Sequence, residues 1–508
     1  MTTASAFSVA LLGMDGAIVE VEAALSAGLP RTVLVGLPDT ALYEARDRCK
    51  AALLGAGLGW PNQLLTINLT PASMPKAGSH YDLAICAAVM ACSEVVPPVS
   101  PRTILLGEVG LDGRIRATRG VLPALAAAKD AGFENAIVSA SQVREAGLIE
   151  GLTVWGVNNL PEMVEVLHGR PIVPDRVAQD RRPAEPIGHP LDLVDVVGQP
   201  EGRWALEVAA AGGHHVFFHG PPGVGKTMLA ERLTGLLPEL GDSEALEVSA
   251  VHSLVGSDLS SGLIRKPPYS DPHHNATVAA MVGGGSRIAR PGAVSLAHRG
   301  VLFLDEAPEF NPKVLEALRT PLESGWISIA RSELTTRYPA RFQLVLAANP
   351  CPCGLAATPG ADCRCTPMAI RRYRERLSGP ILDRIDIHSQ LQPIRKSVLG
   401  KSIEEPEPSA TVASRVAEAR CRARTRLKSF GMITNAEVPG AVMRKQLPLP
   451  DGIQLLDGAL TKGQISTRGV DKILRLAWTL TDLAGVPRVG KEQLIAAMQL
   501  RKGEWVRL

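Results

Sequence analysis

The sequence predicts an α/β fold in which a P-loop core lies between an N-terminal α/β domain and a helical C-terminal domain. Three observations carry this prediction. Residues 1–168 alternate short apolar runs with helical patterns. A glycine-rich loop at residues 220–227 separates a strand pattern from a helix pattern. Nearly all of the sequence from residue 410 onward has helical spacing, and 508 residues leave room for about three domains.

Short apolar runs in the N-terminal region predict strands, and longer periodic segments predict helices. The predicted strands are Ala17–Val21, Thr32–Val35, Leu64–Leu69, Thr103–Leu106 and Ala136–Val138. The predicted helices are Asp39–Leu54, Asp82–Ala91 and Pro123–Ala131.

Proline and charge mark the domain boundaries. Residues 169–190 contain five prolines and many charged side chains, so they are expected to be a linker that buries no core. The charged, proline-bearing stretch Lys401–Ser409 predicts a second connection. The expected domains are therefore residues 1–168, 191–400 and 401–508.

Composition excludes several classes of protein. No apolar run approaches the roughly 20 residues that a membrane-spanning helix needs. Met1–Leu12 has no charged segment before its apolar stretch, which argues against a signal peptide. We therefore expect a soluble cytoplasmic protein without a membrane partner. A net charge of +3 does not by itself indicate nucleic-acid binding, which would need local basic clusters.

The central domain carries a P-loop signature. The apolar run His214–His219 is expected to be a buried strand, and the pattern after residue 227 is helical. Such a loop turns its backbone N–H groups toward phosphates, and the following helix adds a favourable dipole. We expect Lys226 to reach the β- and γ-phosphates of ATP and Thr227 to hold Mg²⁺. The predicted nucleotide-binding loop is Gly220, Pro221, Pro222, Gly223, Val224, Gly225, Lys226 and Thr227.

Two further strand ends supply polar groups. Val301–Leu304 is followed by Asp305 and Glu306, and Gln343–Ala348 is followed by Asn349. Ligands of open α/β sheets bind at the carboxyl ends of strands. Asp305 therefore suits Mg²⁺, Glu306 suits activation of the attacking water, and Asn349 suits orientation of that water.

Two arginines are candidates for stabilising the transferred phosphate. Arg384 follows a short helix pattern, and its permanent charge suits that role in cis or from a neighbouring subunit. A structural ion pair with Asp383 or Asp386 is the alternative. Arg468 lies in the first turn of a predicted helix, where the dipole disfavours a cation, so it is expected to have an anionic partner. The alternative is an ordinary surface arginine.

With these elements in this order, the chain resembles the magnesium-chelatase clade of the AAA+ superfamily, and within it the YifB/ComM group. The most specific stretches are Pro272–Thr277, Gly283–Ser286, Arg290–Gly300, Pro321–Gly325, Ala348–Gly354 and Leu382–Asp386. Asp195–Gln199, which includes Val197 and Gly198, resembles the box on the adenine side of the site.

The resemblance implies a ring, expected to be a hexamer, with ATP sites at subunit interfaces. It assigns Walker A to Gly220–Thr227, Walker B to Asp305–Glu306 and sensor 1 to Asn349. It likewise makes Arg384 the arginine finger and Arg468 sensor 2, with the C-terminal helices as a lid. ComM-type members are linked to DNA branch migration in natural transformation.

The N-terminal domain resembles the Lon-protease-type domain without its catalytic pair. The marker is Pro75–Leu83. In proteolytic relatives a serine and a lysine act together, but the aligned positions here hold His80 and Ala124. Ser79 is one residue out of register. A serine without its base is inert, so we expect a scaffold or a DNA-contacting platform rather than a peptidase.

Four cysteines form a C-x-C-x9-C-x-C pattern: Cys351, Cys353, Cys363 and Cys365. Four thiolates suit a structural Zn²⁺ ion, although C-x2-C is the usual spacing. Unliganded structural thiols and a redox switch are the alternatives.

Two basic clusters could contact DNA phosphates, or could be solvated faces or subunit contacts. They are Arg371–Arg376 and the helix bearing Arg415, Arg420, Arg422, Arg424, Arg426 and Lys428. Trp326–Ala330 and Arg337–Leu346 are expected to form a hairpin around Ser332–Thr336. His273 and His274 are interpreted as structural or loop contacts.

The sequence thus favours an ATPase that remodels DNA, in particular a helicase for branch migration. A protein-remodelling or magnesium-chelatase-type accessory motor is the alternative, and a nucleotide-gated scaffold is the third hypothesis.

Overall fold

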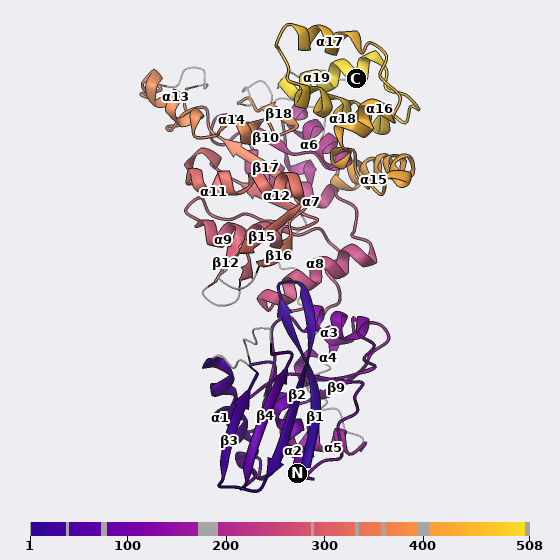
Figure 1. Ribbon diagram of the computed structural model, residues 1–508. Helices are drawn as coiled ribbons and strands as arrows, with labels where there is room; N and C mark the ends of the chain where they lie inside the picture. Colours follow the sequence, from indigo (N-terminus) through magenta and orange to yellow (C-terminus); the bar gives the residue numbers. More distant parts are fainter. Residues whose placement is uncertain are drawn as a thin grey trace.

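The computed structural model describes residues 2–36, 40–72, 79–170, 191–285, 289–330, 335–356, 362–393 and 406–502. The marker residues Pro75–Gly78 and the expected linker from residue 171 to 190 lie outside these ranges. The N-terminal domain occupies one end of an elongated molecule, the P-loop core its middle and the C-terminal helices the other end (Figure 1). Within the described ranges, no helix combines the length and the apolar character needed to cross a membrane.

The N-terminal domain is built on a seven-stranded sheet of order β3-β4-β2-β1-β5-β8-β9. Its strands are β1 (Thr2–Leu12), β2 (Asp15–Ser26), β3 (Arg31–Val35), β4 (Leu64–Thr70), β5 (Thr103–Leu106), β8 (Asn135–Ser139) and β9 (Thr153–Val157). Its helices are α1 (Thr40–Gly55), α2 (Asp82–Cys92), α3 (Val121–Asp130), α4 (Val143–Ala146) and α5 (Leu160–Leu167), and a small ladder joins β6 (Glu108–Val109) to β7 (Ile115–Arg116). Every residue of α2 is buried, so this helix forms the centre of the domain.

Strand β1 is the main element that the sequence did not reveal. It pairs antiparallel with β2 from Thr2↔Leu25 to Leu12↔Asp15. The apolar stretch at the N-terminus is therefore an interior strand of the sheet. The hairpin turn uses Gly13 at φ 71°, a left-handed conformation that glycine adopts without a steric penalty.

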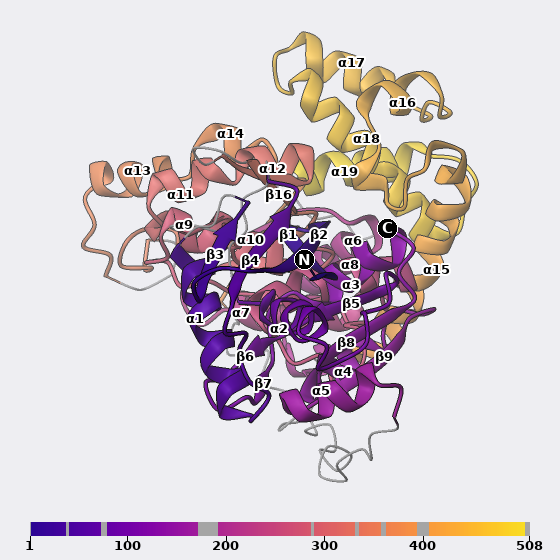
Figure 2. The same ribbon diagram turned by 60° about the horizontal axis from the view of Figure 1, so that its bottom comes forward.

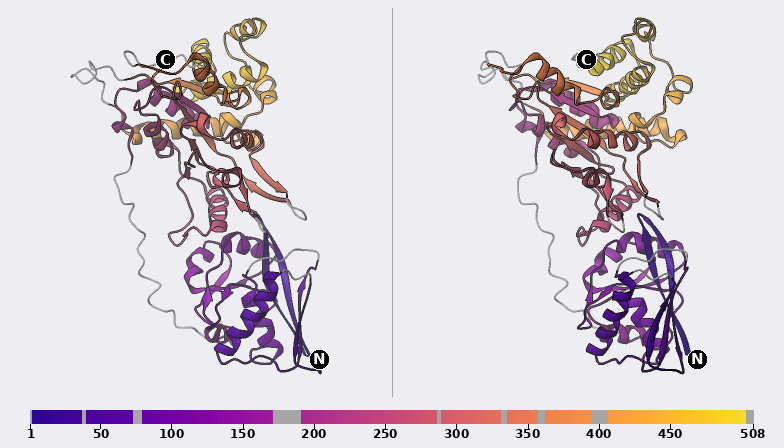
Figure 3. Two further views of the ribbon diagram at one scale, coloured as in Figure 1. Left: turned by 90° about the vertical axis from the view of Figure 1, so that its left-hand side faces the viewer. Right: turned by 60° about the vertical axis from the view of Figure 1, so that its left-hand side comes forward.

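The N-terminal domain contacts the core directly. Ser253, on helix α8 (Asp242–Val255), donates a hydrogen bond to the carboxylate of Glu145 at 2.6 Å. The backbone N–H of Gly120 donates to the carbonyl of the same serine at 3.0 Å. Figure 3 shows the β1–β2 hairpin reaching toward the core beside these contacts.

The core sheet has five strands, all parallel, in the order β11-β14-β17-β10-β18. They are β11 (Tyr269–Ser270), β14 (Val301–Leu304), β17 (Gln343–Ala348), β10 (Val216–His219) and β18 (Ile387–Gln390). Strand β10 begins two residues later than predicted. The His214 ring is buried instead against Thr479, with Nε2 2.7 Å from the hydroxyl oxygen.

Helices cover the core sheet, and short elements complete it. The longer ones are α6 (Pro200–Gly212), α7 (Lys226–Leu236) and α8. The shorter ones are α9 (Val278–Val282), α10 (Ala293–Leu296), α11 (Pro312–Ala317), α12 (Arg319–Ser324), α13 (Pro367–Glu375) and α14 (Gly379–Leu382), with β12 (Gly283–Gly284) paired to β13 (Arg290–Pro291).

The predicted hairpin exists, but its second strand was placed wrongly. Strand β15 (Trp326–Ala330) pairs with β16 (Thr335–Pro339), while residues 343–348 belong to the core sheet as β17. Five buried, apolar residues of β17 pack inside the core, which explains why this run cannot also serve as a hairpin strand. The turn at residues 331–334 lies outside the described ranges.

The C-terminal domain is helical, as its periodicity indicates. Its helices are α15 (Ser409–Leu427), α16 (Gly440–Lys445), α17 (Gln454–Thr461), α18 (Thr467–Ala484) and α19 (Lys491–Lys502). Buried residues of α15 and α18 share one apolar cluster with α6 and β10. Helices α16 and α17 lie on the far side of α18 from the core (Figure 2).

Candidate functional site

The P-loop follows β10 and has an open, glycine-lined interior. Gly223 and Gly225 have φ of 75° and 90°, in the left-handed region. A Cβ atom added to either glycine would meet no atom within 4 Å. The loop leads into the eleven-residue helix α7, whose first residue is Lys226. A glycine-lined loop at a helix N-terminus suits a polyphosphate, which its backbone amides can bind.

Lys226 is held at the carboxyl edge of the sheet. Its side chain is largely buried, and Nζ donates to the carbonyl oxygens of Gly220 and Pro221 at 2.8 Å each. It also donates to Oδ1 of Asn349 at 3.0 Å, 123 residues further along the chain. Burial lowers the pKa of Lys226, and the nearby Asp305 and Glu306 oppose this shift.

Thr227 and Asp305 form an oxygen pair at the same edge. The threonine hydroxyl donates to Oδ2 of Asp305 at 2.9 Å, and Oδ1 accepts the backbone N–H of Glu306 at 2.8 Å. A hydroxyl beside a carboxylate, next to a phosphate cradle, is the donor set that Mg²⁺ takes in nucleotide sites. These residues therefore fit ATP and Mg²⁺.

Glu306 has a partner that the sequence did not indicate. Its backbone is left-handed at φ 49°, and its half-exposed carboxylate oxygen Oε2 lies 3.7 Å from Nδ1 of His274. The rings of His273 and His274 pack with centroids 4.1 Å apart. His274 was interpreted as a structural or loop contact, and the contact that it makes is with the Glu306 carboxylate. The sequence signal for this contact was weak, because 32 residues separate His274 from Glu306.

The segment with Val197 and Gly198 is tied to the P-loop helix. Arg232 of α7 bonds Oδ2 of Asp195 at 2.7 Å and the carbonyl of Asp192 at 2.5 Å. Gly198 has φ 74°, and Val197 is exposed. An exposed apolar side chain beside the P-loop helix could contact a nucleobase.

Arg384 lies at the opposite edge of the sheet from the P-loop. The backbone N–H groups of Asp386 and Ile387 bond the carbonyl of His215, which precedes β10, whereas the P-loop follows it. Parallel strands rise about 3.3 Å per residue, so about 13 Å of strand separates the two edges. Arg384 pairs with Glu323 and donates to the carbonyl of Pro380, so the alternative of an ion pair with Asp383 or Asp386 was wrong in its partner.

Arg468 lies on the same side as Arg384. It is 68% exposed, and Nη1 is 3.8 Å from Oδ2 of Asp383, the acidic neighbour of Arg384. Both arginines line a pocket of 680 Å³. Gly300 and Phe342, which precede β14 and β17, line it too. The pocket therefore opens at the amino edge of the sheet, away from this chain's own P-loop.

The four cysteines come together after β17. Their sulfur atoms all lie within 4.8 Å of one another, and the described residues form no other group of metal-type side chains of this kind.

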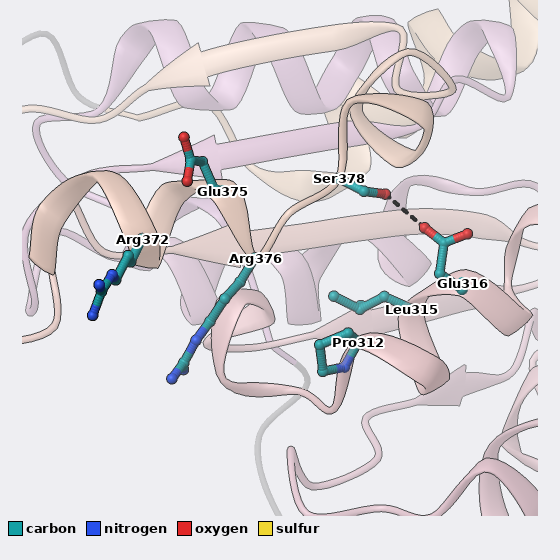
Figure 4. A pocket seen from close by; sticks show the side chains of 7 residues that line it. All are labelled: Pro312, Leu315, Glu316, Arg372, Glu375, Arg376 and Ser378. Atoms are coloured by element: carbon teal, nitrogen blue, oxygen red, sulfur yellow. Dashed lines mark hydrogen bonds between the residues drawn. The ribbon is translucent and has the colours of Figure 1, made fainter. Parts of the chain in front are cut away.

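The two basic clusters differ in how their charges are used. On α15, Arg415 pairs with Glu207 and Glu407, while Arg426 pairs with Asp482 and lies 4.2 Å from the ring centroid of Trp478. Most of this cluster therefore packs the helix in place. On α13, Arg371 is 74% exposed and pairs with Glu375 of the same helix. Figure 4 shows Arg372 and Arg376 projecting from the same side of a 340 Å³ pocket.

The residues at and beside the Lon-like catalytic positions of the N-terminal domain have structural contacts. The Ser79 hydroxyl donates to the carboxylate of Glu108, and burial lowers the pKa of His80 to about 4. Ala124 is buried in α3.

Three family models match successive parts of the chain. They are subunit ChlI of Mg-chelatase at residues 21–142, magnesium chelatase subunit ChlI at residues 192–399, and the ChlI C-terminal model at residues 406–501. Competence protein ComM of Haemophilus influenzae is 38% identical over 505 residues, which is 99% of this chain and 98% of ComM. The chain belongs to the YifB/ComM family of magnesium-chelatase-like AAA+ proteins.

Other relatives match nearly the whole chain or a part of it. An uncharacterised protein of Mycobacterium tuberculosis is 50% identical over 99% of both chains. The uncharacterised protein YifB of Escherichia coli is 39% identical over 97% of this chain and 96% of YifB. Lon protease 2 of Bacillus subtilis is 31% identical over 185 residues, a third of each chain.

Proposed function

We propose that this YifB/ComM-family protein is an ATP-hydrolysing motor that assembles into a ring and remodels DNA. One observation carries the proposal. At one edge of the core sheet the Lys226 side chain bonds that of Asn349 and the Thr227 side chain bonds that of Asp305, while Arg384 and Arg468 lie at the other edge.

Each residue at the carboxyl edge has a different role in ATP hydrolysis. Bound ATP supplies the bond that is cleaved, and bound Mg²⁺ neutralises phosphate charge. Lys226 exchanges its carbonyl partners for phosphate oxygens. Glu306 takes a proton from the attacking water, with His274 orienting its carboxylate. Asn349, already 3.0 Å from the Lys226 ammonium, positions that water.

The ring follows from the division of the site between two edges. Arg384 and Arg468 cannot reach their own P-loop, so they serve the site of a neighbouring copy. A contact between the amino edge of one copy and the carboxyl edge of the next is head-to-tail. Such contacts close into a ring when the rotation permits. A hexamer is the size that the family resemblance favours.

DNA is the proposed substrate because α13 presents a group of exposed cations. Arg371 and Arg372 are exposed, and α13 has exposed Arg374 beside them. Arginine clusters of this kind bind phosphate backbones. The printed name of the relative ComM links that protein to competence, and we extend this link to the present chain.

The catalytic part of the proposal is tested by steady-state ATPase assays. Glu306→Gln should retain binding of a fluorescent ATP analogue and lose turnover, whereas Lys226→Ala should lose binding. Unchanged turnover in either variant would refute the assignment of the site.

The DNA part is tested by stimulation of the ATPase with Holliday junctions, single strands and duplex at several salt concentrations. The double variant Arg371→Glu/Arg372→Glu should lose stimulation, and Lys462→Glu, an exposed cation on the C-terminal domain, is the control. An ATPase that no nucleic acid stimulates would favour the alternative of a protein-remodelling or chelatase-type accessory motor.

A further inference from the structure

The four sulfur atoms after β17 already have the spacing of a tetrahedral metal site. Cys351 Sγ lies 3.3 Å from Cys353 Sγ and 3.8 Å from Cys363 Sγ, and the last two sulfurs are 3.6 Å apart. Cys365 Sγ lies within 4.8 Å of the other three. A Zn–S bond of about 2.3 Å places the sulfurs of a zinc tetrahedron about 3.8 Å apart.

A backbone amide supports one of the thiolates, as amides do in metal sites. Ala356 N donates to Cys351 Sγ at 3.4 Å. Such an N–H···S bond orients the ligand and stabilises its negative charge.

The geometry also separates zinc from other uses of four cysteines. A disulfide needs two sulfurs about 2.05 Å apart, but each measured separation here is at least 3.3 Å. An iron–sulfur cluster spreads its four thiolates around two or more irons, whereas all four sulfurs here lie within 4.8 Å of one another. A tetrahedral S₄ set around one point suits a closed, structural Zn²⁺ site.

This cysteine site is attached to the nucleotide site on one side. Cys351 follows Asn349 by two residues and is fully buried. A Cβ atom on Gly354 would lie 2.6 Å from Cγ of Pro222 and 3.9 Å from Cγ of Asn349. The turn that carries two ligands therefore packs directly against the P-loop and close to the Asn349 amide.

On its other side the cysteine site is followed directly by helix α13. Thr366, which follows Cys365, caps α13 by accepting the N–H of Ala369 at 3.2 Å. Arg374 of this helix donates to the carbonyl of Pro350 at 3.4 Å. The start of α13 is thus fixed by the same loop that holds the sulfurs.

We propose that Cys351, Cys353, Cys363 and Cys365 bind one Zn²⁺ ion that clamps the P-loop and Asn349 to helix α13. The zinc site itself stands on the sulfur geometry alone. Its link to turnover rests on the proposed ATPase function. Through this clamp the position of helix α13 affects the positions of Pro222 and Asn349. The ion takes no part in the chemistry.

Metal content tests the site independently of activity. Tag-free protein purified without chelators should contain about one equivalent of zinc per chain by mass spectrometry of the metals. Cys353→Ser and Cys363→Ser should lose it on dialysis, and Cys421→Ser, which removes an exposed cysteine outside the cluster, should retain it. Cobalt added to metal-free wild type should give the intense visible bands of a tetrahedral thiolate site.

Less than about a tenth of an equivalent of zinc, both as purified and after reconstitution, overturns the site, because structural zinc is bound tightly. Iron in place of zinc overturns the metal assignment. The absence of cobalt bands after cobalt is added to metal-free wild type would also overturn the metal assignment. This test uses wild type only, so it holds even if the cysteine variants fail to fold.

The clamp is tested by Gly354→Ala, which keeps all four ligands and pushes a methyl group toward Pro222. This variant should keep its zinc but lose turnover by on the order of tenfold or more, since small displacements of catalytic groups are costly. Full turnover in Gly354→Ala and in zinc-depleted wild type would overturn the clamp. If zinc is present and even wild type hydrolyses no ATP, the proposed function has failed instead of the zinc site.

Discussion

The placement of Arg384 at the edge of the sheet opposite the P-loop makes a quantitative prediction about mixed rings. Lys226→Ala removes a group that a copy gives to its own site. Arg384→Ala removes a group that the same copy gives to its neighbour's site. An arginine finger contributes a factor of about 10³–10⁵ to turnover, so the Arg384→Ala ring should fall below about a thousandth of wild-type activity. The Lys226→Ala ring should be inactive as well.

A mixture of the two inactive variants should nevertheless regain activity. In a randomly mixed ring, a site is complete when its P-loop comes from an Arg384→Ala copy and its arginine from a Lys226→Ala copy. Each condition is met with a probability of about one half, so about a quarter of the head-to-tail sites are complete. The mixture should therefore recover about a quarter of wild-type ATPase activity, if the sites act independently.

The matched control mixes Lys226→Ala with Glu306→Gln. Both residues lie at the carboxyl edge and belong to the same copy's site. No arrangement of these two variants completes a site, so no activity should return. The variants carry different affinity tags and are mixed as dissociated chains before nucleotide is added, and a sequential pull-down verifies that mixed rings have formed.

Two outcomes would refute the reasoning. Mixed rings of Lys226→Ala and Arg384→Ala without ATPase activity would show that Arg384 acts within its own copy. Recovery in the control mixture would show that the sites are not divided between copies as the sheet edges imply.

Other predictions concern the site and its stability. His274→Ala should lower kcat by roughly tenfold at most, which is the loss expected from one weak polar contact. His273→Ala is the control and should lower kcat less. Equal losses of kcat in the two variants would contradict the positioning role of His274. Burial lowers the pKa of His215 and of His388 to about 4, from 6.5. Because the folded core binds fewer protons than the unfolded chain, its stability should fall as the pH drops below 6.5, by about 2 kcal/mol per histidine at pH 5. Thermal unfolding that is unchanged between pH 7 and pH 5 would contradict this.

Local patterns carried much of the information about this protein. The helix and strand periods predicted seven elements of the N-terminal domain within two residues of where they lie, and an eighth, Ala17–Val21, marks the middle of the longer strand β2. The P-loop could be found because its residues are adjacent and its chemistry depends on glycines at fixed spacing. Asp305 and Asn349 could be found because parallel strands end at one edge of a sheet, a rule that needs no knowledge of strand order.

The sequence by itself determined which groups this YifB/ComM-family chain can offer, but not which of them meet. That Asn349 bonds Lys226 and that Arg384 lies at the far edge depends on strand order and direction, which arise from hydrogen bonds between residues far apart in sequence. Strand β1 was missed because its mixture of small and apolar residues has no clear alternation, and only its pairing with β2 defines it. The contact of His274 with Glu306 and the use of the α15 arginines in packing are likewise properties of the folded chain alone.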